Sequence, residues 1–255
     1  MPEAAGLHYG LHDGGPSAAA RPPVVLIHGA GGTRLHWPPN LRRIKGWAIY
    51  ALDLPGHGAS AGPGRSTIPD YRRAVQAWMD ALGLPPIVAV GHSMGGAVAL
   101  SLALDSPDRV AGLGLMATGA RLRVHPMFLE ATALDGAGAN ALTAAWYSSS
   151  ASPRLRALAA RSLQSMDFAV LHGDFLACDG FDVMDHLAEV RQPALVVVGE
   201  EDQMTPVKYA RYLVDHLPEA RLGIVPGAGH IAMLEQPGAV EKLLGDWLSE
   251  TFLQG

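Results

Sequence analysis

The sequence predicts an α/β fold, with a doubly wound, mostly parallel sheet and an inserted helical cap. Short apolar runs rich in Val, Ile and Leu alternate with segments whose apolar residues have helical spacing. This alternation lapses between residues 119 and 189, where the chain is richer in Ala, Leu and Met. We therefore expect a core formed by residues 1–118 and 190–255 and a helical cap formed by residues 119–189.

Seven segments are predicted to be strands. Most are continuous apolar runs, as in parallel strands that carry helices on both faces. The first alternates weakly and ends in the turn cluster Asp13–Gly14–Gly15–Pro16, which is typical of an edge strand followed by a loop. The predicted strands are residues 7–13, 24–27, 47–53, 87–90, 110–116, 194–198 and 221–225.

Helices are predicted between these strands. The clearest spans residues 66–82, where apolar side chains recur at helical spacing. Ser66 or Thr67 is the expected N-cap of this helix, and Gly83 the expected stop. The other predicted helices are residues 36–43, 95–104, 207–216 and 238–252 in the core, and 140–147 and 155–165 in the cap.

Composition excludes several classes of protein. The chain has 255 residues, 49% of them hydrophobic, which suits a folded globular protein with a sizeable core. A net charge of −5 gives no basic surface for nucleic acid or an anionic membrane. We see no signal peptide and no membrane span, and the single cysteine, Cys178, excludes an internal disulfide. We expect a cytoplasmic monomer or homodimer with no nucleic-acid or membrane partner.

The turn after residues 87–90 carries the pattern Gly-x-Ser-x-Gly, in Gly91–His92–Ser93–Met94–Gly95. A buried strand, this turn and a helix of small residues together are typical of a nucleophile elbow. In such a turn a strained backbone lifts the serine Oγ clear of the sheet. The two glycines are required because the strand and helix backbones pass too close for a Cβ. We expect Ser93 to be a nucleophile rather than a structural turn residue.

A serine hydroxyl needs a base to take its proton and a third group to orient that base. His230 follows the last predicted strand in a glycine-flanked loop, and carboxylates follow the preceding strand in Glu200–Glu201–Asp202. We favour Asp202 because it lies nearest the start of the next helix, with Glu200 and Glu201 as alternatives. These loops share the carboxyl edge of the parallel sheet, where ligands of such folds bind.

The oxyanion that develops on a carbonyl needs preorganised amide donors. Met94 N–H is one expected donor, since it lies at the N-terminus of the elbow helix. Ala30 N–H is the other, with Gly31 as the alternative, in the glycine-rich loop after residues 24–27. Substrate-binding residues are expected in this loop, beside the elbow and in the cap, at Gly29, Gly31, Trp37, His92, Phe128 and Trp146.

Other conspicuous residues are expected to be structural. His28 is predicted to brace the glycine loop, His92 to pack beside the elbow, His57 to be a turn residue and Cys178 to be a small buried hydrophobe. No cluster has metal-ligand spacing and no phosphate-binding glycine pattern occurs, so we expect neither metal nor cofactor. In the cap, apolar residues either line a pocket or hold the cap on the core: Met127, Phe128, Leu129, Leu134, Trp146, Tyr147, Met166 and Phe168.

These motifs resemble the α/β-hydrolase superfamily, in particular its small bacterial esterase and lipase-like branch. The matching segments are His28–Gly29, Asp53–Leu54–Pro55–Gly56–His57–Gly58–Ala59–Ser60, Gly91–His92–Ser93–Met94–Gly95–Gly96, Gly199–Glu200–Glu201–Asp202 with Thr205–Pro206, and Gly229–His230. The resemblance implies the α/β-hydrolase fold, a Ser93–His230–Asp202 triad, an oxyanion hole at Ala30 and Met94, and a cap that acts as a lid. The N-terminus is short, so the first strand of the full eight-stranded sheet is expected to be absent.

The expected function is hydrolysis of carboxylic esters through an acyl-enzyme. The cap is rich in Leu and aromatic residues and has no Arg/Lys cluster, which favours neutral short- to medium-chain esters as small-molecule substrates. Lactonases, C–C bond hydrolases and cofactor-free perhydrolases share this chemistry and remain alternatives. The elbow carries Ser93, whereas haloalkane dehalogenases and epoxide hydrolases place an Asp there. A ligand-binding receptor is the non-enzyme alternative, although all three triad positions are filled.

Overall fold

The computed structural model describes residues 2–133, 145–164 and 166–253. Its centre is an eight-stranded sheet with the strand order β1-β2-β4-β3-β5-β6-β7-β8. The pairs β1–β2 and β2–β4 are antiparallel, and all other neighbouring strands pair in parallel. The strands are β1 (Glu3–Ala4), β2 (Leu7–His12), β3 (Val24–Ile27), β4 (Ile49–Leu52), β5 (Ile87–His92), β6 (Val110–Met116), β7 (Ala194–Gly199) and β8 (Ala220–Val225).

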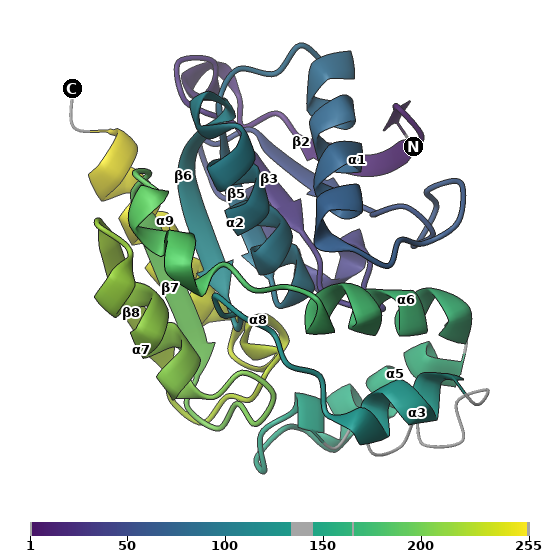
Figure 1. Cartoon of the computed structure of the whole chain (residues 1–255). Coiled ribbons are helices and arrows are strands. Elements are labelled where there is room, and N and C mark those ends of the chain that lie inside the picture. Colours follow the sequence, from purple (N-terminus) through teal and green to yellow (C-terminus); the bar gives the residue numbers. More distant parts are fainter. Residues whose placement is uncertain (1, 134–144, 165, 254–255) are drawn as a thin grey trace.

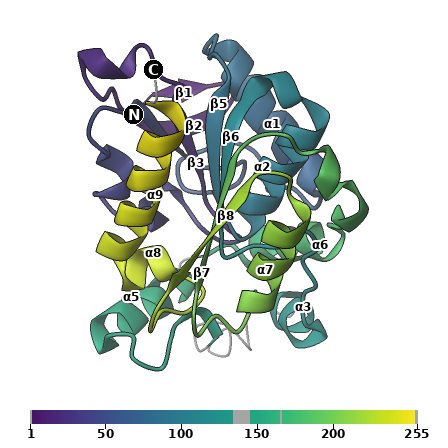
Figure 2. The same ribbon diagram turned by 90° about the vertical axis from the view of Figure 1, so that its left-hand side faces the viewer.

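Helices cover both faces of this sheet (Figures 1 and 2). Helices α1, α2 and α7 lie on one face, and α8 and α9 lie on the other. This arrangement confirms the predicted doubly wound, mostly parallel α/β fold. The helices are α1 (Ile68–Ala81), α2 (Met94–Asp105), α3 (Pro126–Ala133), α5 (Pro153–Gln164), α6 (Phe168–Asp179), α7 (Val207–His216), α8 (Ala232–Glu235) and α9 (Pro237–Phe252).

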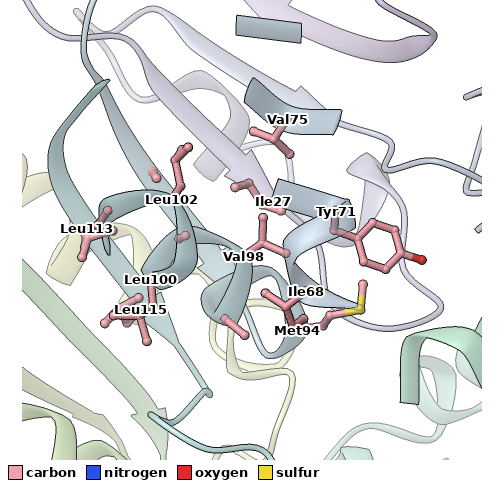
Figure 3. Packing of buried hydrophobic residues seen from close by; sticks show 14 of the residues in the cluster. Ile27, Ile68, Tyr71, Val75, Met94, Val98, Leu100, Leu102, Leu113 and Leu115 are labelled. Carbon is pink, nitrogen blue, oxygen red and sulfur yellow. The ribbon is translucent and has the colours of Figure 1, made fainter. Parts of the chain in front are cut away.

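The core consists of two apolar clusters, one on each face of the sheet. In β5, Ile87 and Ala89 belong to the cluster under α1 and α2, whereas Val88 and Val90 belong to the cluster under α9. Figure 3 shows the first cluster, in which Val98 of α2 lies close to side chains from α1 and β3. Because every central strand is buried on both faces, its sequence is continuously apolar instead of alternating.

Two predictions about secondary structure were wrong: the absence of the first strand and the helix at residues 36–43. The first strand is present, because β1 needs only two residues and pairs with β2 through a hairpin. The two loop residues of this hairpin, Ala5 and Gly6, both have positive φ, as tight two-residue turns require. The predicted helix at residues 36–43 is instead a pair of short 3₁₀ turns, Arg34–His36 and Leu41–Arg43. Pro38 and Pro39 lie between these turns and remove two backbone donors that a helix would use.

Helix α1 begins at Ile68 with Thr67 as its N-cap, whose side chain accepts a hydrogen bond from Asp70 N. This contact decides between the two N-caps that the sequence allowed. Between β6 and β7 the chain forms α3, α5 and α6, which lie together at the lower edge of the molecule in Figure 1. The predicted cap helix at 155–165 corresponds to α5. Most of the predicted helix at 140–147 lies outside the described residues, as does Leu134.

Candidate active site

Ser93 sits between β5 and α2 with a strained backbone. Its φ of 52° and ψ of −116° lie in a region that residues other than glycine rarely adopt. The flanking glycines allow this turn. A Cβ on Gly91 would lie 2.1 Å from Gly95 O, and a Cβ on Gly95 would lie 2.2 Å from Ile27 O. The close approach of strand and helix backbones, expected from the sequence, is therefore present.

Hydrogen bonds with the neighbouring strand β6, and with Thr118 after it, hold the backbone of Ser93 in this strained conformation. Ser93 N donates to Met116 O at 2.9 Å, and Thr118 Oγ1 donates to Ser93 O at 2.8 Å. Gly96 must be small as well, because a Cβ there would lie 2.6 Å from Thr118 Cγ2. Sequence reasoning missed Thr118, since it contacts the elbow only through the pairing of β5 with β6. The serine is thus fixed on its carbonyl and amide sides, while its side chain lines a cavity.

His230 and Asp202 form a buried pair beside this serine. His230 Nδ1 lies 2.9 Å from Asp202 Oδ2 and 3.1 Å from Oδ1. Because a carboxylate only accepts, Nδ1 carries the proton and Nε2 of the neutral ring is left as an acceptor. No hydrogen bond joins Ser93 Oγ to His230 Nε2, but both residues line the same cavity. Such contacts often tighten only when substrate is bound.

Asp202 is held as a carboxylate by several donors. Its Oδ1 accepts from Met204 N and Thr205 N, both at 2.9 Å, and its Oδ2 accepts from Thr205 Oγ1 at 2.8 Å. Burial raises the pKa of Asp202, but the charge and hydrogen bond of His230 and the bonds from Thr205 outweigh it and lower the pKa to about 2.

The two alternative carboxylates contact other groups. Glu200 is exposed and lies 3.3 Å from Gly227 N, and Glu201 accepts from Ser149 N and Oγ, each at 2.8 Å. Among Glu200, Glu201 and Asp202, the structure therefore places Asp202 against His230.

The glycine-rich loop after β3 faces the elbow. His28 Nδ1 donates to Gly29 O at 2.8 Å, and its Nε2 accepts from Leu54 N at 3.0 Å. Burial, followed by the neighbouring His57, lowers the pKa of His28 well below its usual range, so the ring is neutral. His28 thus braces this loop.

The amides of this loop have different partners. Gly31 N donates to Asp174 Oδ2 at 2.7 Å. Ala30 N and Met94 N make no hydrogen bond to any described residue, and Met94 is the first residue of α2, where such free amides are normal. The alternative donor Gly31 is therefore already used, while Ala30 and Met94 are free to donate.

A cavity of about 740 Å³ contains Ala30, Ser93 and His230 in its lining. Its wall includes the expected Phe128 and Trp146, together with Phe175 of α6, which sequence reasoning did not single out. Among the described lining residues, Arg123 is the one basic side chain of the Lys or Arg type and Asp179 the one carboxylic acid, so their charges have opposite sign. The cavity can therefore accept a largely apolar, uncharged ligand against the serine.

Trp37 does not reach this cavity, contrary to the expectation that it binds substrate. Its side chain is 0% exposed and packs in the apolar cluster under α9. Gly29 and Gly31, which were also expected to bind substrate, are not in the cavity lining either. A Cβ on Gly29 would lie 2.8 Å from His92 Nδ1, and one on Gly31 would lie 2.6 Å from Met166 Sδ.

Three further histidines line the cavity: the exposed His125, and His92 and His36, whose pKa values are lowered by burial. His92 packs beside the elbow as predicted, with Nε2 3.0 Å from His230 O. Burial, followed by the nearby His230, lowers the pKa of His92 to about 3. His36, missed in the sequence, lies on the 3₁₀ turn after the glycine loop, and burial lowers its pKa to about 4. The rings of His92 and His36 are neutral near pH 7, so they add no charge around Ser93.

The described residues contain no group of three or more His, Cys, Asp or Glu side chains placed to hold a metal ion. In the same part of the chain, no helix is long and apolar enough to cross a membrane. Cys178 is buried, and burial raises the pKa of its thiol, so it does not act as a thiolate near pH 7.

Comparison with known proteins identifies the family. A family model described as the alpha/beta hydrolase fold matches residues 22–237. The chain belongs to this family. A solved structure described as that of a thermophilic esterase is similar to this chain, with a TM-score of 0.82 and 31% identity, covering 96% of this chain and 98% of that one.

Two curated proteins are similar to this α/β hydrolase in sequence. It is 34% identical over 232 residues to the dihydrolipoyllysine-residue acetyltransferase component of the acetoin cleaving system of Pseudomonas putida. That alignment covers 86% of this chain but only 61% of the relative, so the chain spans less than two thirds of its length. It is also 30% identical over 243 residues to a pimeloyl-acyl-carrier-protein methyl ester esterase of Neisseria meningitidis, covering 88% of this chain and 93% of the relative.

Proposed function

We propose that this α/β hydrolase is a serine carboxylesterase that works through an acyl-enzyme. One observation carries the proposal: a strained Ser93 lines the same cavity as His230, whose Nδ1 is bonded to the buried Asp202. This supplies a nucleophile, a base and an orienting carboxylate in one place. Similar proteins described as an esterase and a methyl ester esterase support ester substrates.

The proposed reaction has two steps. His230 Nε2 takes the proton of Ser93 Oγ, which attacks the ester carbonyl carbon. His230 then gives this proton to the departing alkoxide, so that the alcohol leaves and the acyl group remains on Ser93. In the second step His230 takes a proton from water, the resulting hydroxide attacks the acyl carbonyl, and the carboxylic acid leaves as Ser93 is reprotonated. Asp202 stays ionised throughout and holds the His230 tautomer.

The amides of Ala30 and Met94 are the proposed oxyanion donors. Neither donates to a described residue, whereas the Gly31 amide is bound to Asp174. Met94 N–H also lies at the N-terminus of α2, where the helix dipole favours negative charge. Two such donors act on charge that exists only in the transition state, which is why they accelerate the reaction.

Residues 119–189 are proposed to form a cap that shapes the substrate cavity. Phe128, Trp146 and Phe175 from this segment line the cavity, and Arg123 and Asp179, which also line it, have opposite charge. An uncharged acyl or alcohol group therefore fits better than a dianionic one. We propose neutral short- to medium-chain esters as the substrate class.

The deciding experiment measures hydrolysis of p-nitrophenyl esters with acyl chains from two to twelve carbons. The wild type should turn over the shorter esters and be labelled by a fluorophosphonate. Ser93→Ala should lose both properties, while the matched control Ser66→Ala, at an exposed serine outside the cavity, should keep them. Full turnover by Ser93→Ala would refute the mechanism.

The same experiment separates the alternatives. Lactones, C–C cleavage substrates and peracid formation are assayed beside the esters, and faster turnover in one of these assays would replace the carboxylesterase proposal. Wild-type protein that folds, binds esters and shows neither turnover nor labelling would indicate a ligand receptor instead.

A further inference from the structure

A buried carboxylate on α6 joins three separate segments of the core. Asp174 is 0% exposed. Its Oδ2 accepts from Gly31 N at 2.7 Å and lies 2.8 Å from His57 Nε2, and its Oδ1 accepts from the Tyr71 hydroxyl. Gly31 lies in the loop after β3, His57 after β4 and Tyr71 on α1. The proposed mechanism does not use Asp174, and its cost of burial calls for a function.

The hydrogen bonds around Asp174 fix where the protons are. Tyr71 OH accepts from Arg65 N at 2.9 Å, so its one proton goes to Asp174. His57 faces Pro55 O with Nδ1 at 3.0 Å and Asp174 with Nε2. Pro55 O only accepts, and an ionised Asp174 only accepts, so beside a carboxylate both ring nitrogens of His57 donate and the ring is an imidazolium.

The electrostatics agree with this proton assignment. Burial lowers the pKa of His57, but the hydrogen bond and charge of Asp174 outweigh it and the pKa is raised. The pair is therefore an ion pair, and Asp174 is a charged acceptor for the Gly31 amide. Figure 3 shows Tyr71 with its ring beside the apolar cluster and its hydroxyl turned away from it, as this contact requires.

The hydrogen bond from Gly31 N to Asp174 matters because it holds one of the two peptide planes that flank Ala30. Gly29 C=O and Ala30 N–H belong to one planar trans peptide, so they point in opposite directions. Gly29 O accepts from His28 Nδ1 and from Gly32 N at 3.0 Å, which fixes that peptide plane. The following plane, which carries Gly31 N–H, is held by Asp174.

Ala30 therefore sits between two peptide planes that hydrogen bonds hold in place. Glycine occupies the positions on both sides, and Gly31 has a φ of +60°. No side chain of the loop itself holds the second plane. We infer that Asp174 is a positioning residue that orients the Ala30 amide for the oxyanion. This inference rests on the proposed function, and it adds a device by which α6 sets the geometry of the reacting site.

The experiment compares three variants with the wild type on a short p-nitrophenyl ester. Asp174→Ala removes the acceptor for Gly31 N–H. Asp174→Asn keeps an oxygen that can accept from it. Tyr71→Phe removes one donor to Asp174 and leaves the Gly31 contact in place, so it serves as the matched structural control.

Asp174→Ala should lower kcat by about 10- to 100-fold with KM within threefold, since one oxyanion donor is misplaced, not removed. Asp174→Asn and Tyr71→Phe should keep kcat within fivefold, even where their Tm falls. Unchanged kcat in Asp174→Ala, or an equal loss of kcat in Tyr71→Phe at a similar fall in Tm, would overturn the inference. If Asp174→Ala does not fold, Asp174→Leu combined with Tyr71→Phe tests the same loss in a better-filled site.

A second readout does not depend on activity. In ¹H–¹⁵N spectra, the Gly31 amide should shift upfield and the Ala30 amide should move in Asp174→Ala, while both stay in place in Tyr71→Phe. Unmoved Ala30 and Gly31 signals in Asp174→Ala would overturn the inference even if the ester assay shows turnover. A wild type that hydrolyses nothing would refute the proposed function alone, because the spectra still report on the loop.

Discussion

Replacing Ser93 by glycine should make the protein more stable and inactive. Ser93 has a φ of 52° and a ψ of −116°, a conformation that costs a residue with a Cβ about 1–3 kcal/mol. Glycine adopts it without that cost, but loses about 0.5–1 kcal/mol through the greater freedom of the unfolded chain. The net gain in the free energy of unfolding is therefore between about 0 and 2.5 kcal/mol.

Ser93→Ala is the control that isolates the backbone from the hydroxyl. Alanine keeps the Cβ, so the strain remains, and the side-chain oxygen makes no hydrogen bond to a described residue that its loss would break. We expect the stability of Ser93→Ala to stay within about 0.5 kcal/mol of the wild type, as for most changes without a named mechanism. Both variants should lose nearly all turnover, by roughly 10⁴-fold or more.

Thermal and urea unfolding of the three proteins measures the difference. For a chain of this size about 1 kcal/mol corresponds to about 2–4 °C, so the Tm of Ser93→Gly should rise by up to about 10 °C. A Ser93→Gly variant that is less stable than Ser93→Ala by about 0.5–1 kcal/mol, the cost of glycine alone, would show that the elbow stores no strain. It would also remove the reason for treating the turn as a nucleophile elbow in place of an ordinary loop.

Four other variants test the site and its surroundings. Asp202→Asn should lower kcat by about 10³- to 10⁴-fold on p-nitrophenyl butyrate, because the amide no longer holds the base in the right tautomer, and a loss below tenfold would contradict its role. Gly95→Ala should cost at least about 1–3 kcal/mol in urea unfolding, because its Cβ would lie 2.2 Å from Ile27 O. Gly245→Ala on α9, with nothing within 4 Å, should instead gain about 0.5–1 kcal/mol, and similar effects at both positions would refute the steric reasoning. The pKa of His92 is lowered from 6.5, its ordinary value, to about 3 in the folded protein. Below pH 6.5 the unfolded chain therefore binds a proton that the folded protein does not, and the contribution of His92 to the free energy of unfolding falls as the pH drops. Between pH 7.5 and 5 the wild type should lose about 2 kcal/mol more than His92→Asn, and parallel pH curves for the two proteins would contradict this.

The sequence predicted the fold and the principal polar residues because their signals are local. Gly91 and Gly95 bracket Ser93 within five residues, and steric necessity makes both glycines visible without a structure. His230 and Asp202 each follow an apolar strand closely, so the topology of a parallel sheet brings them to one edge. The sequence could not separate Asp202 from its two acidic neighbours, because only the folded loop shows which carboxylate meets His230.

The residues that the sequence did not reveal act across long separations. Asp174 meets Gly31 over 143 positions, and Thr118 meets the Ser93 carbonyl over 25. Neither contact has a local pattern, since an aspartate within a helix and a threonine after a strand are common. The prediction that Trp37 binds substrate was wrong for a related reason. An aromatic residue near a functional loop can belong to a pocket wall or to the core, and only the packing in the structure places Trp37 in the core under α9.

Two carboxylates show how the segment between β6 and β7 is tied to the loops beside Ser93. Asp174, on α6, accepts from the amide of Gly31, and Glu235, on α8, accepts from Gly229 N at 2.8 Å and from Ser148 N at 3.0 Å. Each of the two glycines adjoins a residue of the proposed site, Ala30 in one case and His230 in the other.

A glycine gives such a loop the close approach it needs, since a Cβ on Gly229 would lie 2.5 Å from Ser148 N, but it leaves the backbone free to rotate. A charged acceptor on another segment removes that freedom with a bond about twice as strong as a neutral one. Both links involve residues between β6 and β7, so a change in the packing of that segment would reach the oxyanion loop and the histidine loop together. Substitutions that alter the cavity wall should therefore change kcat as well as KM when they displace α6 or Ser148.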